Sequence, residues 1–103
     1  MSGPNLTVGP GVITEMVRLA AFEVPGVARV GRGGPPWRAL GGRAVRARVH
    51  RDRVEIRLWI VARPGQPLGP LTAQVRSAVG ATVERLLGLE LGAVTVLVDG
   101  VGG

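Results

Sequence analysis

A stretch of alternating apolar and polar residues between positions 45 and 60 constrains the fold of this chain most strongly. Its apolar members are Val45, Ala47 and Val49 before a turn at residues 51–52, and Val54, Ile56, Leu58 and Ile60 after it. A period of two is typical of a strand that buries one face, so the pattern predicts a β-hairpin. Closing the hairpin at that turn directs all the apolar side chains to one side. The predicted pairs are Val49 with Val54, Ala47 with Ile56, and Val45 with Leu58.

Two segments with helical periodicity flank the hairpin. The first begins at Pro10, because the fixed φ of proline suits the first helical position, and it ends before Pro25 and Gly26. The second begins at Pro70 and ends at Gly88, which we expect to adopt a left-handed cap. The apolar stripes comprise Val12, Ile13, Met16, Val17, Ala20 and Val24 in the first segment, and Leu71, Val75, Ala78, Val79, Thr82, Val83 and Leu86 in the second. Both segments are therefore predicted to be amphipathic helices.

A last alternating run, from Ala93 to Asp99, predicts a third strand with its valines directed inward. The element order is then α-β-β-α-β. This order predicts an α+β fold, a two-layer sandwich with two helices on one face of a small three-stranded mixed sheet. The second helix is the crossover that makes the third strand parallel to the second. Residues Val27–Val30 are expected to form only a short extended piece.

The length of 103 residues suits one domain, which we expect to span residues 10–101. Residues 1–9 are predicted to be a flexible leader, and residues 31–42 a mobile loop, because glycine and proline fill most of its positions. The first residues lack the basic start and apolar stretch of a secretory signal, and the apolar runs are shorter than the ~20 residues that span a membrane. We therefore expect a cytoplasmic protein.

Composition excludes several classes of chemistry. The chain contains no cysteine, which excludes disulfides, thiolate metal sites and cysteine nucleophiles. Its one histidine, His50, lies at the hairpin turn beside Asp52, and we interpret it as a solvated turn residue. The seven acidic residues are scattered singly, so they form neither a carboxylate pair nor a metal-ligand set. We expect no catalytic residues, no metal and no cofactor.

Two motifs resemble those of a known family. The first helix ends in Ala20-Ala21-Phe22-Glu23-Val24-Pro25-Gly26-Val27, and Leu87-Gly88-Leu89-Glu90 leads into the alternating valines Val94, Val96 and Val98. Both are similar to motifs of the alkaline-shock-protein family, the bacterial envelope stress response proteins. The resemblance implies a cytoplasmic protein without catalytic residues that supports envelope homeostasis. In some members it also implies a position near the membrane through a membrane-embedded partner.

Four residues on the polar face of the hairpin are candidates for an interaction surface. They are Arg46, Arg48, Arg57 and Trp59. Tryptophan and arginine are the residue types that most often anchor a protein partner, and tryptophan beside arginine also stacks nucleic-acid bases. The alternative is a solvated sheet face with Trp59 folded under the loop at residues 31–42. Trp37 in that loop is either a packing residue or a second anchor.

The second helix and the end of the first supply three further candidates. Ser77 and Gly80 lie on the predicted outer face of the second helix among small uncharged residues, and Phe22 points away from the stripe of the first helix. A glycine in mid-helix costs about 1 kcal/mol relative to alanine, which the close approach of a second subunit would offset. The alternative explanation is a compositional bias toward alanine and glycine.

Two hypotheses about function follow. The first is a scaffold module that binds a protein partner, membrane-anchored or a second copy of itself. The second is a small nucleic-acid-binding domain, because the net charge is +6 and all thirteen basic residues are arginine. An arginine-rich composition is also typical of a genome rich in G and C. Nucleic-acid binding would weaken steeply with salt.

Overall fold

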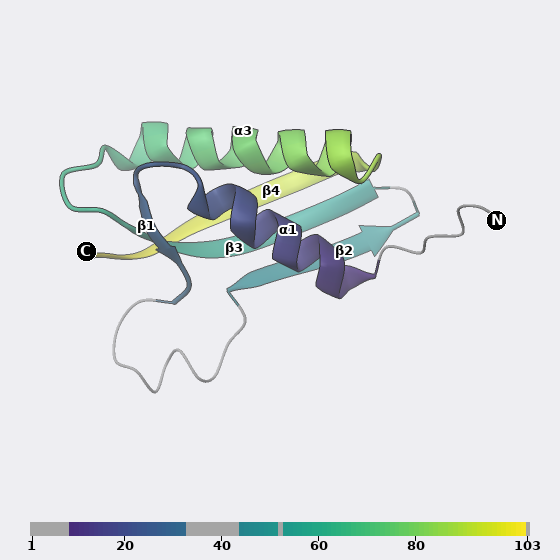
Figure 1. The fold of residues 1–103 in the computed structure, drawn as a ribbon, viewed down its shortest axis with the longest axis horizontal. Helices are drawn as coiled ribbons and strands as arrows, with labels where there is room; N and C mark the ends of the chain where they lie inside the picture. Colours follow the sequence, from purple (N-terminus) through teal and green to yellow (C-terminus); the bar gives the residue numbers. More distant parts are fainter. Residues whose placement is uncertain (1–8, 33–43, 52, 103) are drawn as a thin grey trace.

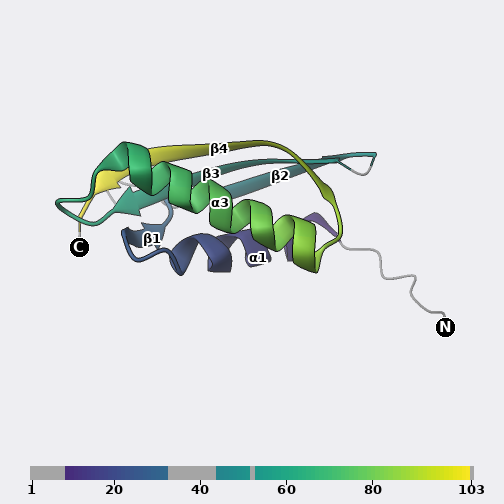
Figure 2. The same cartoon turned by 90° about the horizontal axis from the view of Figure 1, so that it is seen from above.

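The computed structural model describes residues 9–32, 44–51 and 53–102, which form two helices and four strands in the order α-β-β-β-α-β (Figure 1). The elements are α1 (Pro10–Phe22), β1 (Val27–Val30), β2 (Val45–His50), β3 (Arg53–Ala62), α3 (Leu68–Leu86) and β4 (Glu90–Val101). Both helices pack on the same face of the sheet (Figure 2), α1 against β1 and β2 and α3 against β4. The predicted α+β sandwich of two layers is confirmed.

Strand β3 is the centre of a mixed sheet. It runs antiparallel to β1 and β2 and parallel to β4, as predicted for the strand that follows the crossover helix. Strand β2 pairs with residues 53–58 of β3, and β1 pairs with residues 60–62. Because β4 pairs along the whole of β3, the strands β1 and β2 lie end to end along its other edge.

The prediction of three strands was wrong, because Val27–Val30 forms a fourth strand. Four residues with one register shift carry little periodicity of their own. They become a strand because the chain returns from α1 alongside the far end of β3, where the N–H of Arg63 donates to the carbonyl of Gly26 at 2.9 Å. Pairing with a distant segment, and not local pattern, makes this strand.

The hairpin register is confirmed at every predicted pair: Val45 with Leu58, Ala47 with Ile56, and Val49 with Val54. Arg51 lies in the turn with φ of 61°, a backbone conformation that residues other than glycine rarely adopt. The alternation of apolar residues therefore determines the register, even though the turn residue is strained.

Both helices end where the sequence predicts. Helix α1 stops at Phe22, before Pro25, and Gly88 follows α3 with φ of 65°. Helix α3 starts at Leu68 and not at the predicted Pro70. Residues in a first helical turn need no intrahelical partner for their N–H groups, so Pro70 fits inside that turn and the helix begins two residues earlier.

The core lies between the helices and the sheet and consists of aliphatic residues. Its fully buried large members are Ile13, Val17, Val27, Val54, Leu58, Ile60, Leu71, Val75, Val79 and Val83. Two residues of the predicted stripes are exposed, Val12 at 51% in the first turn of α1 and Leu86 at 67% as the last residue of α3. Residues 1–8 of the predicted leader, most of the predicted loop at residues 31–42, and Trp37 lie outside the described residues.

Candidate functional site

The face of the sheet opposite the helices carries most of the described arginines. We call this surface the arginine face and define it by Trp59 and six arginines: Arg29, Arg32, Arg46, Arg48, Arg53 and Arg57. Alternation along each strand directs these side chains away from the buried valines and isoleucines. Three acidic residues accompany them on this face, Glu55, Glu90 and Asp99. The described part of the face is therefore positively charged.

Trp59 lies at the middle of the arginine face. Its backbone occupies the junction between β1 and β2, because its N–H donates to Ala44 at 2.8 Å and its carbonyl accepts from Gly31 at 2.9 Å. The guanidinium carbon of Arg32 lies 4.9 Å from the ring centroid, and that of Arg46 lies 5.8 Å from it. Both distances fall within the range of a cation–π interaction, so two arginines from different segments orient the half-buried indole ring.

Arg32 also connects the two edges of the sheet, across β3. It follows β1, yet its Nε donates to the Oδ2 of Asp99 on β4 at 3.2 Å. Both side chains are about a quarter exposed, so this ion pair is less screened by solvent than the exposed pair of Arg53 and Glu90 at 2.8 Å. The ion pair with Asp99 keeps the guanidinium of Arg32 over the ring of Trp59.

The remaining candidates of the hairpin lie beside Trp59. Arg46 and Arg57 lie directly opposite each other, which places two like charges together, and Arg48 lies opposite Glu55 as the register predicts. All three arginines are exposed. An anionic group of a ligand placed between Arg46 and Arg57 would relieve their repulsion, so this corner of the surface favours an acidic partner.

The other sequence candidates lie away from the arginine face. Ser77 is exposed on α3 and Phe22 is 52% exposed at the end of α1, both in the helix layer. Gly80 is buried, contrary to its predicted place on the outer side of α3. A Cβ at this position would lie 3.0 Å from Cδ2 of Leu91, so the close neighbour of Gly80 is β4 of the same chain. Gly80 is not available to a second subunit.

Sequence reasoning missed Arg32 and Asp99. Asp99 continues the alternation of Val94, Val96 and Val98 and could have been assigned to the outer face. Arg32 lies in a glycine-rich segment without periodicity, so no local signal indicates its contact with Trp59. The contact between Arg32 and Asp99 depends on β1, β3 and β4 lying side by side in the sheet.

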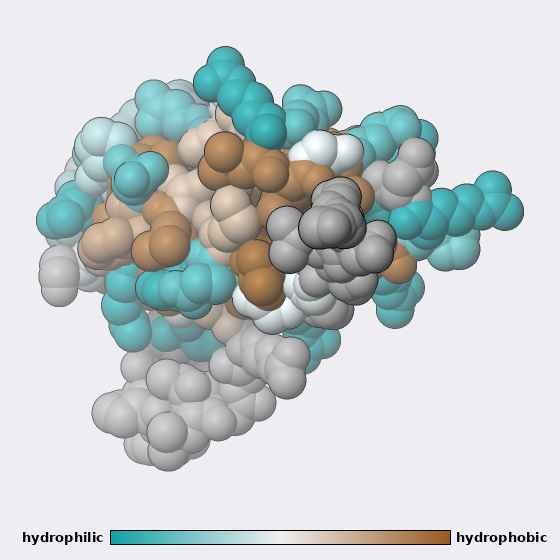
Figure 3. Space-filling model, turned by 45° about the vertical axis from the view of Figure 1, so that its right-hand side comes forward, coloured by the Kyte–Doolittle hydropathy of each residue, from teal (hydrophilic) through white to brown (hydrophobic). Residues whose placement is uncertain are grey.

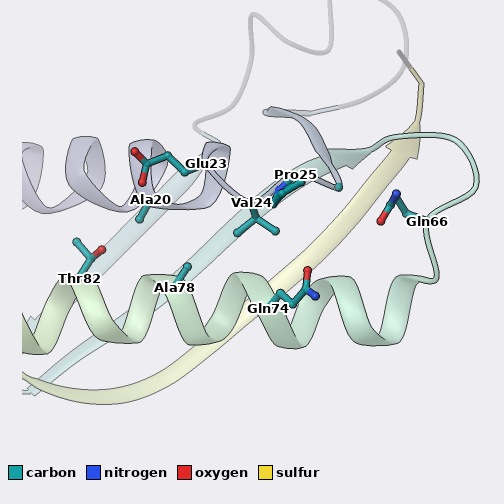
Figure 4. A pocket seen from close by; sticks show the side chains of 9 residues that line it. Ala20, Glu23, Val24, Pro25, Gln66, Gln74, Ala78 and Thr82 are labelled. Atoms are coloured by element: carbon teal, nitrogen blue, oxygen red, sulfur yellow. The ribbon is translucent and has the colours of Figure 1, made fainter.

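A groove of about 570 Å³ lies between the helices (Figure 4). The end of α1 and the segment after it supply one wall, and Gln74, Ala78 and Thr82 of α3 supply the other. The described lining combines small apolar side chains with two carboxamides, one hydroxyl and the carboxylate of Glu23. This set contains no nucleophile paired with a base, so the groove offers no recognisable catalytic chemistry.

The helix layer also exposes apolar side chains. Val12, Leu19, Phe22 and Leu86 are half exposed or more. Figure 3 shows hydrophobic residues in patches among hydrophilic ones on the side turned to the viewer. Single exposed apolar residues are normal on protein surfaces and do not by themselves define a binding site.

Two further kinds of feature were sought in the part of the chain that the structure describes. No group of three or more histidine, aspartate or glutamate residues there is arranged to hold a metal ion. Neither of the described helices has the length and apolar character needed to cross a membrane.

These features define a class: a small two-layer α+β domain with one helix-covered sheet face and one arginine-rich face. The solved structures of MamM CTD share the fold. A methionine-to-leucine variant has a TM-score of 0.64 and 19% identity, and the match covers 87% of this chain and 95% of that one. A glutamate-to-histidine variant in a nickel form has a TM-score of 0.64 and 18% identity, covering 87% and 96%. At this identity the likeness shows the fold alone.

The family model that matches the chain spans residues 3–102 and describes the alkaline shock protein 23 family, with a cell envelope-related function. The chain belongs to this family, which confirms the family resemblance of its sequence motifs. The description of the family names no catalytic activity. A search among curated proteins gave no match.

Proposed function

We propose that this chain is a non-enzymatic interaction module of the cell envelope, and that its arginine face binds an acidic segment of a protein partner. The observation that carries the proposal is the position of Trp59, half-buried on the sheet face opposite the helices and contacted by Arg32 and Arg46. A tryptophan held in place loses little conformational entropy when a partner covers it, and such residues supply much of the energy of protein interfaces.

The charge distribution supports an acidic partner. Six arginines and three acids lie on the described arginine face, and two of those acids already form ion pairs with Arg32 and Arg53. Arg46, Arg48 and Arg57 are left with Glu55 as the nearby acid in the sheet register. Carboxylates of a partner would therefore find guanidinium donors that are exposed and closely spaced.

The envelope-related function of the family supports a partner that is itself anchored in the membrane. In this proposal the chain acts on the cytoplasmic side and reaches the membrane through that partner. The arginine face would determine which partner the chain binds, and the helix layer would cover the hydrophobic core on the other face of the sheet.

Nucleic acid is the second candidate ligand, because the same arginines and Trp59 suit phosphates and a stacked base. The two candidates differ in salt dependence. Binding to a single strand should weaken with salt, so that the logarithm of the association constant falls with a slope of about −0.7 per phosphate contact against log salt. A partner that also packs on Trp59 should depend on salt less steeply.

The test is capture of native partners by the tagged chain from nuclease-treated lysate, comparing Arg46→Ala with the control Arg76→Ala. Each variant removes one exposed arginine and lowers the net charge by the same amount, but Arg76 lies on α3. We expect a nuclease-resistant partner that is lost with Arg46→Ala and with Trp59→Ala and retained with Arg76→Ala. Equal loss with both arginine variants would indicate a general charge effect and contradict the proposal.

A further inference from the structure

Strand β4 has a free edge that no described strand pairs with. Its partner on the inner side is β3, and no other strand of the described residues adjoins it (Figures 1 and 2). A strand paired on one side directs the N–H and carbonyl of every second residue at solvent. Such an edge is a template for a further strand unless the chain blocks it.

The two edges of this sheet differ in how they are protected. The edge formed by β1 and β2 consists of strands of four and six residues, carries Arg29, Arg46 and Arg48, and is interrupted after β1. Short strands and charged side chains are the usual devices against unwanted pairing. Strand β4 has twelve residues, and none between Leu91 and Val98 is charged or a proline.

The regular part of β4 is the segment Val94–Val98. Register shifts between Val54 and Ile56 and between Ile60 and Ala62 mark irregularities on either side of it. The segment pairs without interruption with Ile56–Ile60 of β3. The free edge therefore offers five residues in regular extended conformation.

The side chains of this segment are incompletely covered. Val94, Val96 and Val98 point toward the helix layer but are only partly buried, whereas their neighbours on β3, Leu58 and Ile60, are fully buried. The difference arises because nothing described lies beyond β4. A further strand with its own covering helix would bury these valines.

We propose that this edge pairs with the same edge of a second copy of the chain, antiparallel around a two-fold axis at Val96. The segment Val94-Thr95-Val96-Leu97-Val98 is symmetric in residue character about its centre. The axis places Val94 opposite Val98 and Thr95 opposite Leu97 of the partner, so inward side chains meet inward ones.

The charged residues that flank the segment permit this arrangement. The paired segment Val94–Val98 contains no charged residue, and the nearest acids on β4, Glu90 and Asp99, lie outside it. Both acids are also neutralised within their own chain by Arg53 and Arg32. Pairing with a second copy therefore opposes no like charges within the segment.

The pairing has a consequence for the arginine face. An axis perpendicular to the sheet keeps both helix layers on one side and both copies of the arginine face on the other. The pair would present two Trp59 sites to one partner surface, and bivalent contact strengthens binding without any new contact within each site. The inference itself rests on β4 alone and not on the proposed function.

The test pairs Thr95→Glu with Leu97→Glu in one chain. Within a single copy, a glutamate at position 95 lies next to Arg57, so the fold should tolerate the change. Across the axis the two glutamates of each copy face those of the other, which repels the copies. We expect the wild-type chain to approach twice its mass of 10.7 kDa in sedimentation analysis as concentration rises, and the double variant to remain at 10.7 kDa.

A complementary chain distinguishes repulsion from misfolding. The variant with Thr95→Lys and Leu97→Lys should also remain monomeric. Mixing it with the glutamate variant should restore a dimer, because opposite charges then face each other across the axis. The control Ala81→Glu changes an exposed residue of α3 and should leave the mass as in the wild type. Amide exchange in the wild type should slow with concentration at residues 94–98.

Two results would overturn the proposal. One is a wild-type chain that stays at 10.7 kDa, which would leave the edge to a strand of another protein. The other is a glutamate variant that still forms a dimer, which would show that the copies associate through a different surface.

Discussion

Gly80 offers a sharp test of how α3 packs on the sheet. Glycine in the middle of a helix costs about 1 kcal/mol relative to alanine, so Gly80→Ala should stabilise the chain if the position faces open space. In the structure the added Cβ would lie 3.0 Å from Cδ2 of Leu91, a few tenths of an ångström inside ordinary contact. The gain in helix propensity and the crowding act in opposite directions.

The magnitude follows from the two effects. Overpacking a core costs about 1–3 kcal/mol, and a single contact with a partly buried leucine on an edge strand belongs at the low end of that range. We therefore expect Gly80→Ala to change the free energy of unfolding by about zero in the wild-type background. With Leu91→Ala the crowding disappears, and the same substitution should stabilise by about 1 kcal/mol.

The assay is a double-mutant cycle in urea, followed by helical circular dichroism with the m-value checked for each variant. The expected coupling between Gly80→Ala and Leu91→Ala is about 1 kcal/mol. Gly69→Ala is the control, because a Cβ at Gly69 meets nothing within 4 Å, and its effect should be the same in both backgrounds. If Gly80→Ala also stabilises equally in both backgrounds, Gly80 does not pack against Leu91.

Two further predictions concern the turn and the first helix. Arg51→Asn should raise the free energy of unfolding by about 0.5–1 kcal/mol, because asparagine tolerates the positive φ of this turn; an unchanged urea midpoint would contradict the strain. The hydrogen bond from Arg18 lowers the pKa of the Glu15 carboxyl. A lowered folded pKa gives stability that is present above the unfolded value and lost as the pH falls through the folded one. Glu15→Gln should therefore destabilise slightly near neutral pH, with a difference that vanishes in acid. Nuclear magnetic resonance titration should also show a higher Glu15 pKa in Arg18→Gln than in the wild type.

Local pattern was sufficient for much of this fold. The alternation around the turn determines the pairing of Val45 with Leu58, because a shift of one residue would expose every buried side chain of the hairpin. Proline and glycine mark the ends of α1 and α3 because each residue limits the backbone locally, as the φ of 65° at Gly88 illustrates. The polar side of the hairpin, with Arg46, Arg57 and Trp59, follows from the same alternation.

Contacts between distant segments decided the rest. Val27–Val30 is a strand only because it lies against β3, and Gly80 is buried only because the short connection after α3 returns Leu91 beneath it. Arg32 and Asp99 are separated by 67 residues, yet they meet across Trp59. Sequence periodicity reports which way a side chain faces on its own element, but not which other element covers it. That second property comes from tertiary packing, and it distinguishes the free edge of β4 from the protected edge of β1 and β2.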